Sequence, residues 1–284
     1  ESIKKLQKKL QIKNKIDKNS KILVLREQGV GDEILYGTIY RDILENVSNV
    51  TIECDKRLIN IFKNSFKDFK SKFTELGSIS GNDVELKKYN NVIYAGSLGK
   101  YYRNKTIDFK KKPYLKADKK KIEEVKKLIN NNKKYNIDIS WRSFKNRYSN
   151  EKSLKLEDMM NIFNLNYSNF LNIQYGDVQS EINDFEKKSK IKINNIDEID
   201  IFNDMDGLSA LLMNLDIFVT VSNSTAHLAG ALGVKTLLIK PMNHALFHYW
   251  NQPDIKTPWY ESVILIDKKI LKDEILLSKY LKLK

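Results

Sequence analysis

The chain has 284 residues, of which 41% are hydrophobic, and it carries a formal net charge of +14. This length suffices for two ordinary globular domains, each with its own core. No run of eighteen apolar residues occurs and the first twenty residues are charged, so the sequence predicts neither a membrane-spanning helix nor a secretory signal.

The positive charge comes mainly from lysine, because only six of the fifty basic residues are arginine. Lysines spread over solvated helix faces raise the net charge without forming a binding groove, so we expect no nucleic-acid partner. Peripheral contact with an anionic membrane stays open. The single cysteine, Cys54, excludes an internal disulfide and fits a reducing compartment, so we expect a cytoplasmic protein.

The N-terminal part alternates short apolar runs with helical patterns, which is typical of a Rossmann-like domain. We predict an amphipathic helical lead-in over residues 1–18 and an N-terminal Rossmann-like domain over residues 19–117. The expected strands cover residues 21–25, 50–54 and 91–95, and the expected helices cover 33–45 and one or two stretches within 57–73.

The remaining chain repeats the alternation and predicts a second Rossmann-like domain over residues 118–266, followed by a helix in 267–284 that packs on the domains. We expect strands at 135–141, 170–175, 199–202, 217–221, 236–239 and 263–266, and helices at 118–132, 156–165, 178–188, 206–214, 226–232 and 269–282. The fold class is therefore α/β, with two sheets facing a central cleft.

A glycine-containing turn follows the first predicted strand. Gly29 and Gly31 allow close approach of a ligand, and Asp32 stands where an N-cap belongs. The turn partly matches the glycine pattern of a dinucleotide-binding site, but Ile34 occupies the third glycine position. The Asp32 carboxylate would also compete with a pyrophosphate for the start of the helix. We interpret Asp32 as a functional carboxylate at a cleft, with simple helix capping as the alternative.

The stretch 217–241 reads as strand, polar turn, helix and strand. In a parallel sheet this turn lies at the carboxyl edge, where the helix presents unpaired N–H groups and the positive end of its dipole. Ser222, Ser224 and Thr225 add hydroxyl donors at the same point. The turn therefore predicts a phosphate site, although an ordinary N-cap is the alternative.

Other strand ends also hold polar side chains. Arg142 follows the strand at 135–141, and an arginine retained in a lysine-rich chain indicates bidentate binding of phosphate or carboxylate. Gly96 and Ser97 follow the strand at 91–95, at the edge where an α/β sheet binds ligands. The basic segment 100–112 comes next and is either an acceptor loop or an ordinary solvated surface.

Two histidines, His244 and His248, are spaced for one face of a helix, which could ligate a metal. Because no third ligand is near in sequence and aromatic residues fill the gaps, we expect this segment to form a pocket wall. We predict no metal site.

Five segments, taken together and in this order, resemble the heptosyltransferase-like glycosyltransferase family of the family 9 type, in the version found in bacterial tetratricopeptide-repeat proteins. They are residues 26–32 (REQGVGD), 139–143 (ISWRS), 173–177 (IQYGD), 216–233 (DIFVTVSNSTAHLAGALG) and 259–263 (WYESV). The resemblance spans about residues 20–266. It implies a GT-B architecture and an inverting, metal-independent transfer of a sugar from a nucleotide-diphosphate donor, without a cofactor, to a glycan, lipid-linked or protein acceptor.

The resemblance also implies roles for individual residues. Asp32 matches the general base, and Arg142 and Lys152 match the cations that neutralise the donor diphosphate. His227 matches a motif histidine near the donor, with burial beneath the helix as the alternative. The diphosphate would lie on Ser222, Asn223, Ser224 and Thr225, and the loops lining the cleft would be those that hold Gln28, Gly29, Gly31, Gly96 and Ser97.

The chain departs from the family pattern at Ser222, where many relatives carry aspartate. Serine keeps the cap but loses the charge. An alternative hypothesis is therefore a catalytically silent GT-B module that binds a nucleotide, a glycan or a protein partner.

Overall fold

A computed structural model describes residue 8 and residues 16–129, 133–144, 149–165 and 167–281 of the chain. The helical lead-in predicted over residues 1–18 lies almost wholly outside these residues. The chain divides into two compact units. Unit 1 comprises residues 1–110 and 114–116, and unit 2 comprises residues 111–113 and 117–284.

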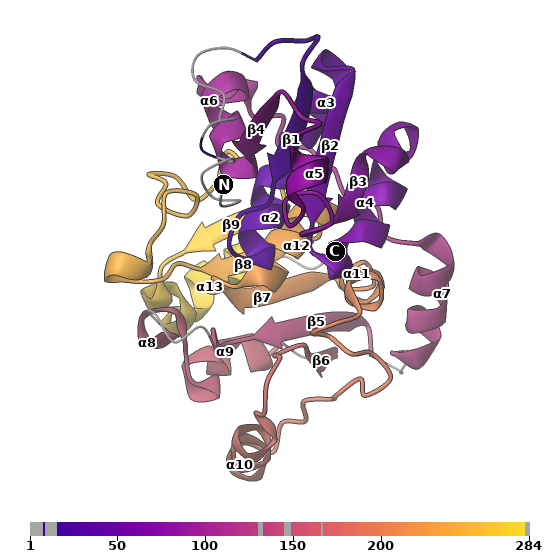
Figure 1. The fold of residues 1–284 in the computed structure, drawn as a ribbon. Helices are drawn as coiled ribbons and strands as arrows, with labels where there is room; N and C mark the ends of the chain where they lie inside the picture. The colour runs from indigo at the N-terminus through magenta and orange to yellow at the C-terminus, as the bar shows by residue number, and fades with distance from the viewer. Residues whose placement is uncertain (1–7, 9–15, 130–132, 145–148, 166, 282–284) are drawn as a thin grey trace. The chain divides into compact units, whose positions relative to one another are not determined.

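Unit 1 is built on a parallel sheet of four strands in the order β3-β2-β1-β4 (Figure 1). Its central strand, β1, is buried at four of its five positions, because a strand covered on both faces needs two apolar faces. The strands are β1 Lys21–Leu25, β2 Asn49–Cys54, β3 Phe73–Glu75 and β4 Asn91–Tyr94, and the α-helices are α2 Val30–Gly37, α3 Tyr40–Asn46, α4 Ile59–Ser65, α5 Asp83–Leu86 and α6 Gly99–Tyr102.

Three predictions for this unit are wrong in detail. The helix predicted at 33–45 is two helices, because the chain turns at Thr38 and Ile39, whose N–H groups donate to carbonyls three residues earlier. Asp32 is the third residue of α2, and the N-cap is Gly29. The loop expected after β4 is also helical, since a 3₁₀ turn at Ala95–Leu98 leads into α6.

Unit 2 is built on a parallel sheet of five strands in the order β6-β5-β7-β8-β9 (Figure 1). The strands are β5 Tyr135–Ser140, β6 Ser168–Asn172, β7 Ile217–Val221, β8 Thr236–Ile239 and β9 Val263–Ile266. The α-helices are α7 Lys119–Leu128, α8 Ser149–Lys152, α9 Met160–Phe163, α10 Gln179–Ser189, α11 Met205–Leu212, α12 Ser224–Leu232 and α13 Glu274–Leu281.

The core of unit 2 lies around β7, which is buried at all five positions. The C-terminal helix α13 contributes to it through Leu277 and Leu281. The strand predicted at 199–202 is not formed, because the Asp200 carboxylate accepts from the N–H groups of Phe202 and Asn203 and holds this stretch as a turn. Within the described residues, no helix combines the length and apolarity needed to span a bilayer.

The packing of α12 leads to a stability prediction. A Cβ atom added to Gly230 would lie 2.6 Å from the Tyr260 ring, so Gly230→Ala must displace that ring. We expect the free energy of unfolding to fall by about 1–3 kcal/mol in urea denaturation. The control is Gly99→Ala, where an added Cβ meets nothing within 4 Å. A neutral or stabilising Gly230→Ala would contradict the packing.

Candidate functional site

The strand order of unit 2 places a topological switch point between β5 and β7. In open α/β sheets of this order, ligands bind in the crevice outside the carboxyl ends of the two strands at such a point. Arg142 follows the end of β5, and Ser222 and Asn223 follow the end of β7. The structure therefore brings two predicted site segments to one edge of one sheet.

Hydrogen bonds tie these two strand ends together. Asn223 caps α12 by accepting from the Ala226 N–H at 2.9 Å, and its amide donates to Ser140 Oγ at 2.9 Å. Ser140 in turn donates to Gln174 Oε1 at 3.1 Å, and the same oxygen accepts from the Arg142 backbone N–H at 2.6 Å. Asn223 was predicted as a site residue, whereas Ser140 and Gln174, which hold it in place, lie within the segments 139–143 and 173–177 but were not predicted individually.

The Arg142 side chain is oriented by the carboxylate of Glu181, which was not predicted as a site residue. Its Nε lies 3.2 Å from Glu181 Oε2, and Glu181 Oε1 accepts from the indole N–H of Trp141 at 3.0 Å. Arg142 is 43% exposed, and its two terminal nitrogens have no partner among the residues that the structure describes. With respect to the described residues, the guanidinium is thus anchored at one nitrogen and open at its fork.

The turn at Ser222 packs against a cluster of aromatic residues. Ser222 Oγ accepts from the Trp250 indole N–H at 3.1 Å, and the Trp250 ring stacks on His227 with centroids 4.9 Å apart. His227 is 3% exposed and its Nδ1 lies 3.2 Å from the Tyr260 hydroxyl. Of the two readings given for His227, its position matches burial beneath the helix.

The remaining residues predicted for the donor differ in exposure. Thr225 is buried, whereas Ser224, the first residue of α12, is partly exposed. The Lys152 ammonium lies 4.8 Å from the centre of the Phe247 ring. His244 belongs to a 3₁₀ turn at Asn243–Ala245, so the helical face considered for a metal site is not formed there. No group of three or more potential metal ligands occurs among the described residues.

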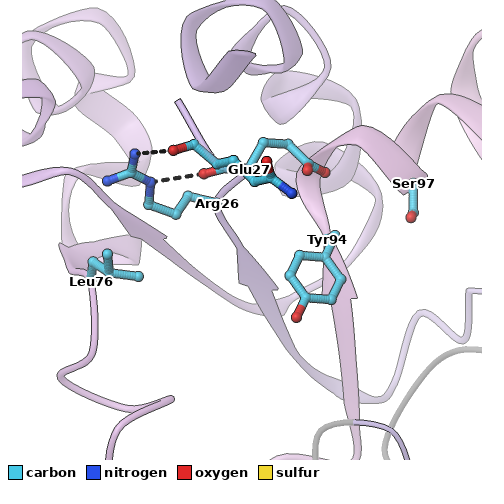
Figure 2. Close-up of a pocket in the computed structure, with 6 residues that line it drawn as sticks. Arg26, Glu27, Leu76, Tyr94 and Ser97 are labelled. Carbon is cyan, nitrogen blue, oxygen red and sulfur yellow. Dashed lines mark hydrogen bonds between the residues drawn. The ribbon is translucent and has the colours of Figure 1, made fainter. Parts of the chain in front are cut away.

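Unit 1 holds a cavity of about 730 Å³ at the carboxyl ends of β1 and β4, shown in Figure 2. Its lining is formed by Arg26, Glu27, Gln28, Leu76, Tyr94 and Ser97. Of these, only Gln28 and Ser97 were predicted. The Gly96 N–H donates to Glu27 Oε1 at 2.8 Å, and a Cβ atom at Gly96 would lie 2.7 Å from that oxygen. Glycine is therefore needed for the close approach of these two loops.

Beside this cavity, charged side chains form a network around Asp55. Arg26 lies 3.0 Å from both Glu33 and Asp55, and Arg57 contacts Asp55 at 2.9 Å. Burial raises the pKa of Glu33 to about 7, against the opposing effect of Arg26. The hydrogen bond from the Arg57 side chain is the largest effect on Asp55 and lowers its pKa to about 2.

This network predicts a pH-dependent contribution to stability. The pKa of Asp55 is lowered from 3.8 to about 2, so its carboxylate stabilises the fold above pH 3.8 and loses this effect as the pH falls towards 2. Asp55→Asn is expected to reduce the free energy of unfolding by about 2 kcal/mol at pH 7 and about half as much at pH 3. Urea denaturation at both pH values measures this, and an equal loss at both would contradict the assignment.

Each unit is a Rossmann-like parallel sheet, and together they match GT-B glycosyltransferase structures, which confirms the predicted fold class. E. coli ADP-heptose lps heptosyltransferase II matches 92% of this chain and 98% of its own at 12% identity, with a TM-score of 0.59. The glycosyl transferase family 9 structure from Veillonella parvula matches 89% of each chain at 9% identity, with a TM-score of 0.62. E. coli heptosyltransferase WaaC with ADP gives a TM-score of 0.50 at 8% identity over 89% of this chain and 98% of its own.

Among curated proteins, the chain is similar to Protein FlbA of Caulobacter vibrioides, with 22% identity over 263 residues. The match covers 87% of this chain but 43% of FlbA, so the chain spans less than half the length of that relative. No family model matches the chain.

Proposed function

We propose that the chain is a glycosyltransferase of the hexosyl- or heptosyltransferase type, which moves a sugar from a nucleotide-diphosphate donor to a glycan, lipid-linked or protein acceptor. The observation that supports this best is the site at the switch point of unit 2. There the open fork of Arg142 and the N-terminus of α12 lie at neighbouring strand ends that are joined through Asn223, Ser140 and Gln174.

This arrangement suits a diphosphate leaving group. When the bond from the sugar to the diphosphate breaks, negative charge develops on the departing phosphate oxygen. Arg142 can donate two parallel hydrogen bonds to phosphate oxygens, and the first N–H groups and dipole of α12 favour an anion at the same edge. Lys152 supplies the second cation in this proposal, and Ser224 supplies the exposed hydroxyl.

Asp32 is the base in this proposal. It lies in the first turn of α2, after the glycine-containing turn at the carboxyl end of β1. Its carboxylate accepts the proton of the acceptor hydroxyl, whose oxygen forms the new bond to the anomeric carbon as the nucleoside diphosphate leaves. This single displacement inverts the anomeric configuration and, in our proposal, needs neither a metal ion nor a cofactor.

Calorimetric titration with UDP, GDP, ADP, CMP and dTDP, with and without Mg²⁺, tests the donor site. ADP is the first probe, because WaaC was solved with ADP. Binding of one nucleotide, independent of Mg²⁺, together with turnover of its diphosphate sugar supports the transferase. Binding without turnover favours the silent module, and failure of every nucleotide to bind contradicts the donor site. The cytoplasmic location and the association with tetratricopeptide repeats stay predictions.

A further inference from the structure

We propose that the cavity of unit 1 binds an uncharged sugar ring, which makes the acceptor a neutral glycan. This inference rests on the proposed function and deepens it, because the sequence left glycan, lipid-linked and protein acceptors open. The cavity has the volume of a ligand site, about 730 Å³, and lies at the switch point between β1 and β4. Its lining combines an aromatic ring with polar groups that suit hydroxyls (Figure 2).

The apolar part of the lining comes from two exposed side chains. Tyr94, the last residue of β4, is 37% exposed, and Leu76, which follows β3, is 47% exposed. A pyranose ring has a face of C–H bonds with hydroxyls at its rim, and that face packs on the negative face of an aromatic ring. Tyr94 at the wall of a cavity therefore provides a platform for a sugar.

The polar part of the lining matches the hydroxyls of the same ring. Glu27 Oε1 is fixed by the Gly96 N–H, whereas its Oε2 has no hydrogen-bond partner in the described part of the chain. The Gln28 amide and the Ser97 hydroxyl likewise make no side-chain hydrogen bond with a described residue. A carboxylate, an amide and a hydroxyl together both accept and donate, as each sugar hydroxyl requires.

The charges of the lining favour a neutral sugar over an acidic or phosphorylated one. Arg26 is the single cation among the six lining residues, and it is already paired with Glu33 and with Asp55, which Arg57 shares. Its guanidinium also donates to the carbonyls of Glu27 and Gln28, as Figure 2 shows. Among the lining residues, an anionic ligand would thus meet the Glu27 carboxylate and a cation that is already paired, which is unfavourable.

The cavity also lies near the proposed base. Tyr36 belongs to α2, like Asp32, and its ring would lie 3.1 Å from a Cβ atom added to Gly96, next to the Glu27 carboxylate. Tyr36 stands four residues after Asp32 on α2, so the two side chains lie on the same face of that helix. Burial raises the pKa of the Tyr36 hydroxyl, and the charges of Glu27 and Asp32 raise it further. A sugar in the cavity is therefore near the carboxylate that would accept its proton.

Saturation-transfer NMR with methyl glycosides of glucose, galactose, N-acetylglucosamine and rhamnose tests the cavity, with glucuronate and glucose 1-phosphate as anionic probes. We expect at least one neutral glycoside to show transfer to its ring C–H protons. Tyr94→Ala should weaken that binding about tenfold, whereas Tyr94→Phe keeps the platform and should stay within about twofold. The control is Tyr167→Ala, which removes a tyrosine that is 75% exposed in unit 2.

Glu27→Gln provides a second test, because glutamine still has an oxygen to accept from the Gly96 N–H. We expect weaker binding of the neutral glycoside and a gain in glucuronate binding. The inference is overturned if no neutral glycoside binds, if Tyr94→Ala binds as well as the parent protein, or if an anionic probe binds more tightly. Titration of the same samples with the five nucleotides separates the two proposals. Nucleotide binding without glycoside binding refutes only the cavity, and glycoside binding without binding of any nucleotide refutes only the donor site.

Discussion

Replacing Asp32 by asparagine is expected to lower the rate of sugar transfer by about 10³-fold, because the carboxamide cannot accept the proton of the acceptor hydroxyl. Asparagine has nearly the same shape, so the fold of α2 should persist. In the proposal Asp32 contacts the acceptor hydroxyl and not the nucleotide, so nucleotide affinity should change by less than about twofold. Release of nucleoside diphosphate measures the rate, and calorimetry measures the affinity.

The control for this variant is Asp206→Asn. Asp206 also lies in the first turn of a helix, α11, so both substitutions remove a favourable interaction with a helix dipole of about 0.3–1 kcal/mol. Only the Asp32 substitution should abolish transfer. If Asp32→Asn keeps the parental rate, the base is another group, and Glu27 becomes the next carboxylate to replace because it lines the unit-1 cavity.

The strands that the sequence predicts well are those with a continuous apolar run between polar turns. The bounds of β1, β7, β8 and β9 agree with the prediction to the residue. The three-residue strand β3 is too short to show a periodicity, and it was missed. The stretch at 199–202 has the apolar pattern of a strand, but hydrogen bonds to the Asp200 side chain hold it as a turn. Side-chain hydrogen bonds of this kind compete with strand pairing, and a pattern of hydrophobicity does not reveal them.

The candidate site likewise contains residues that could be predicted from the sequence and residues that could not. Arg142, Ser222 and Asn223 could be predicted because each follows a recognisable strand, and parallel strands end at the same edge of a sheet. Their partners could not, because these come from distant parts of the chain. Glu181 reads as an ordinary acidic residue in the first turn of α10, and only the folded chain places it beside Arg142.

The surroundings of His227 could not be predicted either. Its ring is enclosed by Trp250 and Tyr260, which follow it by more than twenty residues. Because Trp250 also donates to Ser222, we interpret the histidine as support for the turn through Trp250. Ser222 thus has a hydrogen-bond partner within its own unit.

Arg142→Ala is expected to weaken binding of the nucleoside diphosphate about 30-fold, or about 2 kcal/mol, because a charge-assisted bidentate contact is lost. Arg142→Lys should recover only part of the affinity, since an ammonium restores the charge but not the planar fork. The matched control is Arg41→Ala. Arg41 is also 43% exposed and also paired to a carboxylate, Glu45 at 3.3 Å, but it lies on α3 in unit 1.

The comparison of the two arginines separates a local contact from general electrostatics. Each substitution removes one positive charge from a chain of net charge +14, so a nonspecific attraction of the anion would weaken equally in both variants and would fall steeply with added salt. A specific site predicts loss in Arg142→Ala alone. Equal affinities of Arg142→Ala and the parent protein would remove Arg142 from the diphosphate site and leave the N-terminus of α12 as its main component.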